Sequence, residues 1–115
     1  MSVTIYHNPR CSKSRQTLAL LEDNGISPTI VEYLKTPPSA AEIQIILAEL
    51  DIKARELIRT GEDEYKTARA QVEAMDETDV AGWLSENPRA IQRPIVVTAK
   101  GTRIGRPPEN VLEII

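Results

Sequence analysis

The nine residues His-Asn-Pro-Arg-Cys-Ser-Lys-Ser-Arg, at positions 7–15, mark a junction between a predicted strand and a predicted helix. They follow a run of β-forming residues at positions 3–6, and Asn8-Pro9 ends that run. The pattern that follows predicts a helix over residues 11–25, with a glycine as its C-terminal stop. A second β-forming run occupies positions 29–33. A strand, a helix and a strand this close together predict a parallel strand pair joined by a right-handed crossover.

The rest of the chain predicts a helical insert and then a hairpin. Ser39 and Glu42 form a capping box at the start of a helix. The expected helices of the insert cover residues 39–50, short pieces of 53–75, and 78–85. Strands are then expected at 95–98 and 102–104, and Pro107 opens a last short helix. This order predicts an α/β fold with a mixed four-stranded sheet, flanking helices and a helical insert, in a single domain over residues 1–115.

The composition of the chain argues against several classes of function. The 115 residues carry a net charge of −3, which argues against nucleic-acid binding. One cysteine cannot form an internal disulfide, as expected in a reducing compartment. The first residues do not resemble a signal peptide, and no stretch has the apolar length of a membrane span. We therefore expect a soluble cytoplasmic protein that binds neither nucleic acid nor membrane.

The single cysteine, Cys11, has an unusual setting. Arg10 precedes it, Lys13 and Arg15 follow it, and His7 lies four positions upstream. A cysteine reacts as its thiolate, and nearby positive charge or a helix N-terminus lowers the thiol pKa. The pattern predicts a nucleophile, while the alternative is an exposed cysteine without a role. His7 could tune the thiolate or bond to the turn that follows it.

Ser14 stands where a dithiol motif would have its second cysteine. Because the chain has no partner thiol, any redox cycle at Cys11 requires an external thiol.

Three arginines lie beside rigid or apolar stretches, and each could bind an oxyanion. Arg59 follows Leu57-Ile58, Arg93 precedes Pro94, and Arg106 precedes a pair of prolines. An arginine at a rigid turn is a pre-organised donor fork for a tetrahedral oxyanion, although a single arginine is more often a solvated surface charge. Taken alone, Pro94 is expected to be trans at the start of an edge strand. The acidic run at residues 62–64 is interpreted as a solvated face.

Four motifs occur in order: YHNPRCSKSR, YLKTPPS, RPIVV and GRPPENVLEI. Together they resemble the thioredoxin-fold arsenate reductase family of the glutaredoxin-coupled type, over essentially the whole chain. The residues flanking the cysteine, and the end of the chain at Ile115, are most similar to the short arsenate reductase-like branch. The resemblance implies a thioredoxin-like fold and a role in arsenic detoxification.

The resemblance also implies roles for individual residues. Cys11 would be the nucleophile, and the three arginines would bind the oxyanion. Pro94 falls on the cis-proline that faces the active-site cysteine in thioredoxin-like proteins, which replaces the trans expectation above. The residues implied to support the site are His7, Ser14, Arg15 and Pro94.

The implied reaction begins with attack of the Cys11 thiolate on arsenate, which gives a covalent thiol–arsenate adduct. Glutathione, as co-substrate, then reduces the adduct, and glutaredoxin resolves the mixed disulfide so that arsenite leaves. We expect a monomer with no bound cofactor and no metal site, acting on arsenate or a similar oxyanion. Two alternatives are a single-cysteine thiol–disulfide oxidoreductase and an Spx-like regulatory binding protein; in the second, Ser14 removes the usual Cys-x-x-Cys switch. A third is an interaction module without catalysis.

Overall fold

The computed structural model describes residues 2–115, which form two compact units. The first contains the residues up to Thr36 together with Arg93–Ile115, and the second contains Pro37–Gln92. The helices formed by the described residues lack the combination of length and apolar character that a bilayer crossing requires.

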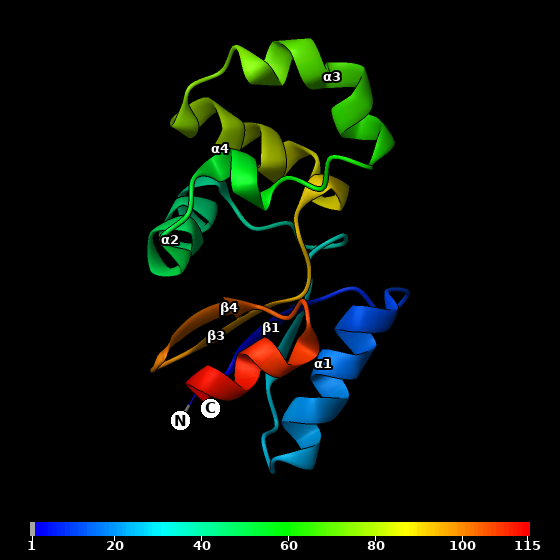
Figure 1. Cartoon of the computed structure of the whole chain (residues 1–115), viewed down its shortest axis with the longest axis vertical. Coiled ribbons are helices and arrows are strands. Elements are labelled where there is room, and N and C mark those ends of the chain that lie inside the picture. Colours follow the sequence, from blue (N-terminus) through cyan, green and yellow to red (C-terminus); the bar gives the residue numbers. More distant parts are fainter. Residues whose placement is uncertain (1) are drawn as a thin grey trace. The chain divides into compact units, whose positions relative to one another are not determined.

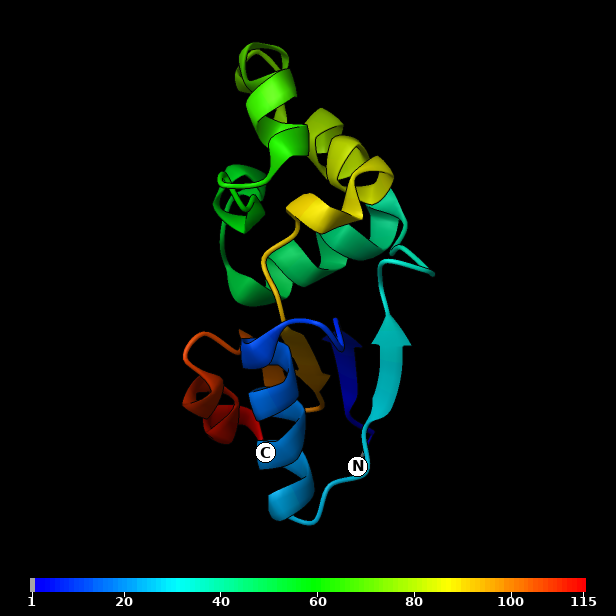
Figure 2. The same ribbon diagram turned by 90° about the vertical axis from the view of Figure 1, so that its right-hand side faces the viewer.

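The first unit is built on a four-stranded mixed sheet with strand order β2-β1-β3-β4 (Figure 1). The strands are β1 (Thr4–His7), β2 (Thr29–Glu32), β3 (Ile95–Thr98) and β4 (Gly101–Ile104). β1 and β2 are parallel, as Figure 2 shows, and β3 pairs antiparallel with both β1 and β4. Helix α1 (Ser12–Asp23) connects the parallel pair. The predicted α/β class, mixed sheet and crossover are confirmed, with β2 one residue shorter than expected.

One face of the sheet is covered by α1 and by the 3₁₀ helix η3 (Pro108–Ile114). Alternate residues of β1 and β3 point to this face, since the side-chain period of a strand is two. Ile5 and Val96 lie opposite each other in the ladder and are fully buried against Leu21 of α1 and Val111 of η3. Burial of apolar side chains on this face stabilises the unit.

Gly105 fixes a close approach within the first unit. A Cβ at this position would lie 2.6 Å from Thr17 Oγ1 and 2.9 Å from Pro94 Cγ. The N–H of Gly105 also donates to the Pro94 carbonyl at 2.8 Å. The absence of a side chain therefore sets the distance between α1 and the turn that starts β3.

The second unit consists of helices, as the sequence predicts. They are α2 (Ala40–Leu50), α3 (Asp63–Glu73), α4 (Glu77–Glu86) and the 3₁₀ turns η1 (Ala54–Leu57) and η2 (Pro88–Ala90). The expected capping box is present, since Ser39 Oγ accepts from the Glu42 N–H at 3.1 Å and the Glu42 carboxylate accepts from the Ser39 N–H at 3.0 Å. α2 packs against α4 (Figure 1), and their buried faces include Ile43, Ile46, Val80 and Leu84.

The acidic run at residues 62–64 differs from its interpretation as a solvated face. Only Asp63 is exposed. The side chains of Glu62 and Glu64 are 18% and 27% exposed, and both pair with arginines. The interpretation was wrong because Arg89, which is distant in sequence, lies next to both carboxylates.

Candidate active site

Cys11 lies between the end of β1 and the start of α1, where it is the N-cap residue. The turn before it is held by two hydrogen bonds. The Cys11 N–H donates to the Asn8 carbonyl at 3.0 Å, and the Arg10 N–H donates to Asn8 Oδ1 at 3.0 Å. Pro9 fits this turn because its fixed φ suits the bend and it has no N–H to satisfy. Cys11 is partly exposed, so a reactant can reach its surface.

Two of the residues expected to support the site, Ser14 and Arg15, hold this turn from α1. Ser14 Oγ lies 2.6 Å from Nδ1 of the buried His7 and accepts from the Asn8 N–H at 3.0 Å. Arg15 donates to the Pro9 carbonyl at 2.9 Å. Burial lowers the pKa of His7, although Glu32 opposes this, so His7 holds the turn as a neutral imidazole at physiological pH.

The surroundings of the sulfur favour the thiolate. Burial by itself raises the pKa of Cys11, but the Ser14 N–H, the Arg93 side chain and the Lys13 N–H lower it by more. The net result is a pKa below that of an ordinary thiol. The two N–H groups belong to the first turn of α1, where four amides have no partner within the helix. The helix start contributes as expected, whereas the guanidinium at the sulfur comes from Arg93 and not from a sequence neighbour.

Arg93 connects Cys11 with a residue that the sequence reasoning did not select. Burial lowers the pKa of Arg93, but its interactions with Cys11 and with Tyr33 raise it by more. Tyr33 is 1% exposed, and burial raises the pKa of its hydroxyl. Two sequence signals pointed to Tyr33: it begins the YLKTPPS motif, and it ends a predicted strand opposite residues 8–11, here called the thiol turn. Parallel strands end at the same edge of a sheet.

Arg106, which follows β4, lies next to the loop that carries Arg93. Arg106 Nη1 donates to the Arg93 carbonyl at 3.5 Å, a long hydrogen bond. The Arg93-Pro94 bond is cis, as the resemblance implied. The Arg106-Pro107 bond is also cis, which the sequence analysis did not anticipate. In the first unit, Arg93 thus interacts with Cys11, and Arg106 lies next to Arg93.

Arg59 belongs to the second unit and has different neighbours. Its N–H donates to the Ala90 carbonyl at 2.6 Å, next to a short antiparallel bridge between Ile58 and Ile91. Its Nη1 lies 3.6 Å from a Glu62 carboxylate oxygen and has no hydrogen-bond acceptor among residues 2–115. Glu62 also pairs with Arg89 at 3.7 Å. Convergence of Arg59 with Cys11 stays a prediction.

The arrangement in the first unit suits nucleophilic attack on an anion. The Cys11 sulfur is partly exposed, and its surroundings favour the thiolate. The Arg93 guanidinium beside it can hold negatively charged oxygens in a planar, bidentate contact.

Comparison with known sequences agrees with this chemistry. Residues 6–114 match the profile of the ArsC family. An arsenate reductase of Haemophilus influenzae is 46% identical over 116 residues, which covers all of both chains. The uncharacterized protein YfgD of Escherichia coli strain K12 is 49% identical over 114 residues, or 98% of this chain and 96% of the relative.

Comparison with solved structures supports the fold. The arsenate reductase from Vibrio cholerae superimposes with a TM-score of 0.94 at 45% sequence identity. The match covers 100% of this chain and 98% of the other. The two folds therefore agree over the whole length of this chain.

Proposed function

Since this chain belongs to the ArsC family, we propose that it reduces arsenate to arsenite with Cys11 as the attacking nucleophile. The observation that carries the proposal is the contact between the Cys11 thiol and the Arg93 side chain, at the N-terminus of α1. A thiolate and a guanidinium side by side supply the nucleophile and one binding group for a tetrahedral anion.

The first step forms a sulfur–arsenic bond. The Cys11 thiolate attacks arsenic, and one arsenate oxygen is protonated and leaves as water. Negative charge on the remaining oxygens is stabilised by Arg93, by Arg106, which bonds to the Arg93 carbonyl, and by Arg59. His7, Ser14, Arg15 and Pro94 keep the thiol turn and the arginine loop in place.

The second step needs an external reductant because Cys11 is the only cysteine. The glutathione thiol attacks the Cys11 sulfur of the adduct, and the sulfur–arsenic bond breaks with its electron pair left on arsenic. Glutaredoxin then resolves the mixed disulfide between Cys11 and glutathione and so restores the Cys11 thiol. Two thiols become one disulfide, and their two electrons reduce As(V) to As(III), which leaves as arsenite. This scheme requires no bound cofactor, places the protein in the reducing cytoplasm, and is compatible with a monomer that acts as a single domain.

The experiment that tests the proposal is an NADPH-coupled assay with glutaredoxin, glutathione and arsenate, run beside an assay with a small disulfide substrate. We expect turnover with arsenate that depends on Cys11. Turnover of the disulfide alone would replace the proposal with the second candidate, a single-cysteine thiol–disulfide oxidoreductase. That candidate uses the same thiol and the same cis Pro94 but needs no converging arginines.

A further inference from the structure

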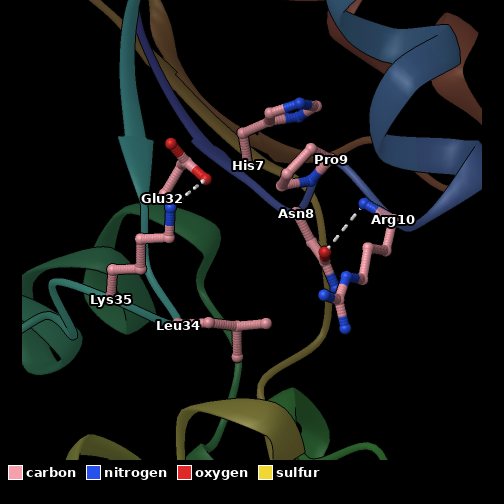
Figure 3. Close-up of a pocket in the computed structure, with 7 residues that line it drawn as sticks. All are labelled: His7, Asn8, Pro9, Arg10, Glu32, Leu34 and Lys35. Carbon is pink, nitrogen blue, oxygen red and sulfur yellow. Dashed lines mark hydrogen bonds and ion pairs between the residues drawn. The ribbon is translucent and has the colours of Figure 1, made fainter.

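A pocket of about 400 Å³ lies beside the turn that precedes Cys11. Figure 3 shows its two sides: residues 7–10 form one, and Glu32, Leu34 and Lys35, at and after the end of β2, form the other. All of these residues belong to the first unit. The volume lies within the range of sites that hold small molecules.

The charged groups around this pocket are mixed. Arg10 stands on one side, and Glu32 and Lys35 stand on the other. Arg10 forms no ion pair with any of residues 2–115. Glu32 Oε1 lies 3.7 Å from Lys35 Nζ, which is longer than a hydrogen bond, so the carboxylate can accept from a further donor. His7 is neutral, so the lining carries two positive charges and one negative charge.

The pocket also has an apolar part. Leu34 is 38% exposed, although leucine is usually buried, and Figure 3 shows its side chain reaching toward Asn8 and Arg10. Pro9 adds a second exposed apolar surface. A ligand that fits has methylene groups or a thiol between its charged ends.

We infer that this pocket binds glutathione, with its two carboxylates on Arg10 and Lys35 and its ammonium group on Glu32. The inference rests on the proposed function, which needs glutathione as the reductant. Glutathione carries two carboxylates and one ammonium group at neutral pH, so each charge has one partner of opposite sign in the pocket. Its thiol lies on the central residue, between the charged ends.

A ligand in this pocket is close to Cys11. Arg10 is the residue before Cys11, and the Cys11 N–H bonds to the Asn8 carbonyl. From the other side, Tyr33, which lies between Glu32 and Leu34 in the chain, interacts electrostatically with Cys11. An extended tripeptide spans about 10 Å, and the thiol of glutathione lies on its central residue. Binding then holds the reductant near the adduct and removes the entropy cost of a chance encounter.

The direct test is binding of S-methylglutathione, which cannot react, followed by NMR of the backbone amides. We expect shifts in residues 7–10 and 32–35, and an affinity about three- to tenfold weaker in Arg10→Ala and Lys35→Ala. The matched control is Lys66→Ala, which removes one exposed positive charge from the other unit. Shifts that lie elsewhere, or equal binding by all four proteins, would overturn the inference.

The ammonium contact is tested with an analogue that lacks the α-amino group. Glu32→Gln should weaken S-methylglutathione about threefold and leave the deaminated analogue unchanged, whereas Glu22→Gln, on the exposed side of α1, should change neither. Equal losses for both ligands would overturn the pairing of Glu32 with the ammonium.

Steady-state kinetics distinguish glutathione binding in this pocket from the proposed reduction of arsenate. In the coupled assay, Arg10→Ala should raise the KM for glutathione and leave the KM for arsenate within about twofold. If the KM for glutaredoxin rises instead, the pocket recognises the protein and the inference is wrong. Normal S-methylglutathione binding without any arsenate turnover would contradict the proposed function while supporting the pocket.

Discussion

The thiol turn of the first unit and the Arg59 loop of the second stabilise charge in opposite ways. Neutral hydrogen bonds among His7, Ser14 and the backbone hold the thiol turn, and Arg93 contacts the sulfur itself. Around Arg59, by contrast, the carboxylate of Glu62 offsets the guanidinium. An anion at the thiol turn meets amide and guanidinium donors that act on the sulfur, whereas an anion bound by Arg59 must compete with a carboxylate.

The largest effect is expected from Cys11→Ser, which removes the nucleophile and leaves the donors in place. Arsenate turnover should fall by about 10⁴-fold or more, because the remaining groups bind but do not react. Oxyanion binding, measured by calorimetry with arsenate, should remain detectable. Residual turnover near that of the natural chain would show that the thiol turn is not where the reaction occurs.

Arg93→Lys and Arg59→Lys compare the two regions directly. Lysine keeps the charge and loses the planar donor fork, so Arg93→Lys should lower arsenate turnover by about 10²-fold while iodoacetamide labelling of Cys11 changes little. Arg59→Lys should have the smaller effect, since Glu62 already offsets its charge. The same two measurements on Arg106→Lys test the third arginine. Full activity in both Arg93→Lys and Arg106→Lys would contradict the arginine site.

Two glycine substitutions should change stability in opposite directions. Gly105→Ala places a Cβ 2.6 Å from Thr17 Oγ1, so it should lower the free energy of unfolding by about 1–3 kcal/mol. Gly82 lies within α4, and a Cβ there meets nothing within 4 Å. Gly82→Ala should therefore raise the free energy of unfolding by about 0.5–1 kcal/mol. Urea titrations of both variants measure this difference, and equal shifts would contradict the close packing at Gly105.

The smallest effect is expected from Glu62→Gln. Removing this carboxylate should lower the KM for arsenate about two- to fivefold, because Arg59 no longer has a competing anion. Glu64→Gln is the matched control, because the Glu64 carboxylate pairs with Arg89, whose Nε lies 3.5 Å away. An unchanged KM in Glu62→Gln would separate Arg59 from the oxyanion site and confine that site to the first unit.

Local patterns allowed most of the fold to be predicted. β-forming runs ended by proline or glycine specified the strands, and the capping box at Ser39 specified the start of α2. The place of Cys11 at the start of α1 followed from the same signals. These features depend on residues near one another in sequence, where backbone preferences act.

Contacts between residues distant in sequence could not be predicted from local patterns. The contact of Arg93 with Tyr33 and the pairing of Glu62 with Arg89 are not marked by any periodic pattern or fixed spacing in the sequence. The second cis bond, at Arg106-Pro107, also had no local signal. The three arginines were selected one by one from the rigid or apolar stretches beside them, and spacing alone could not show whether they converge.

The place of Cys11 at the start of α1 couples reactivity to folding. α1 has no side-chain cap and no acidic residue in its first turn, so the sulfur is the group placed to carry negative charge at its positive end. Because the pKa of Cys11 is lowered in the folded state, ionisation stabilises the native chain. That stabilisation is complete above the pKa of an unfolded thiol, about 8.5, and is lost as the pH falls through the folded-state pKa. The native chain is thus more stable in the ionisation state in which its sulfur reacts.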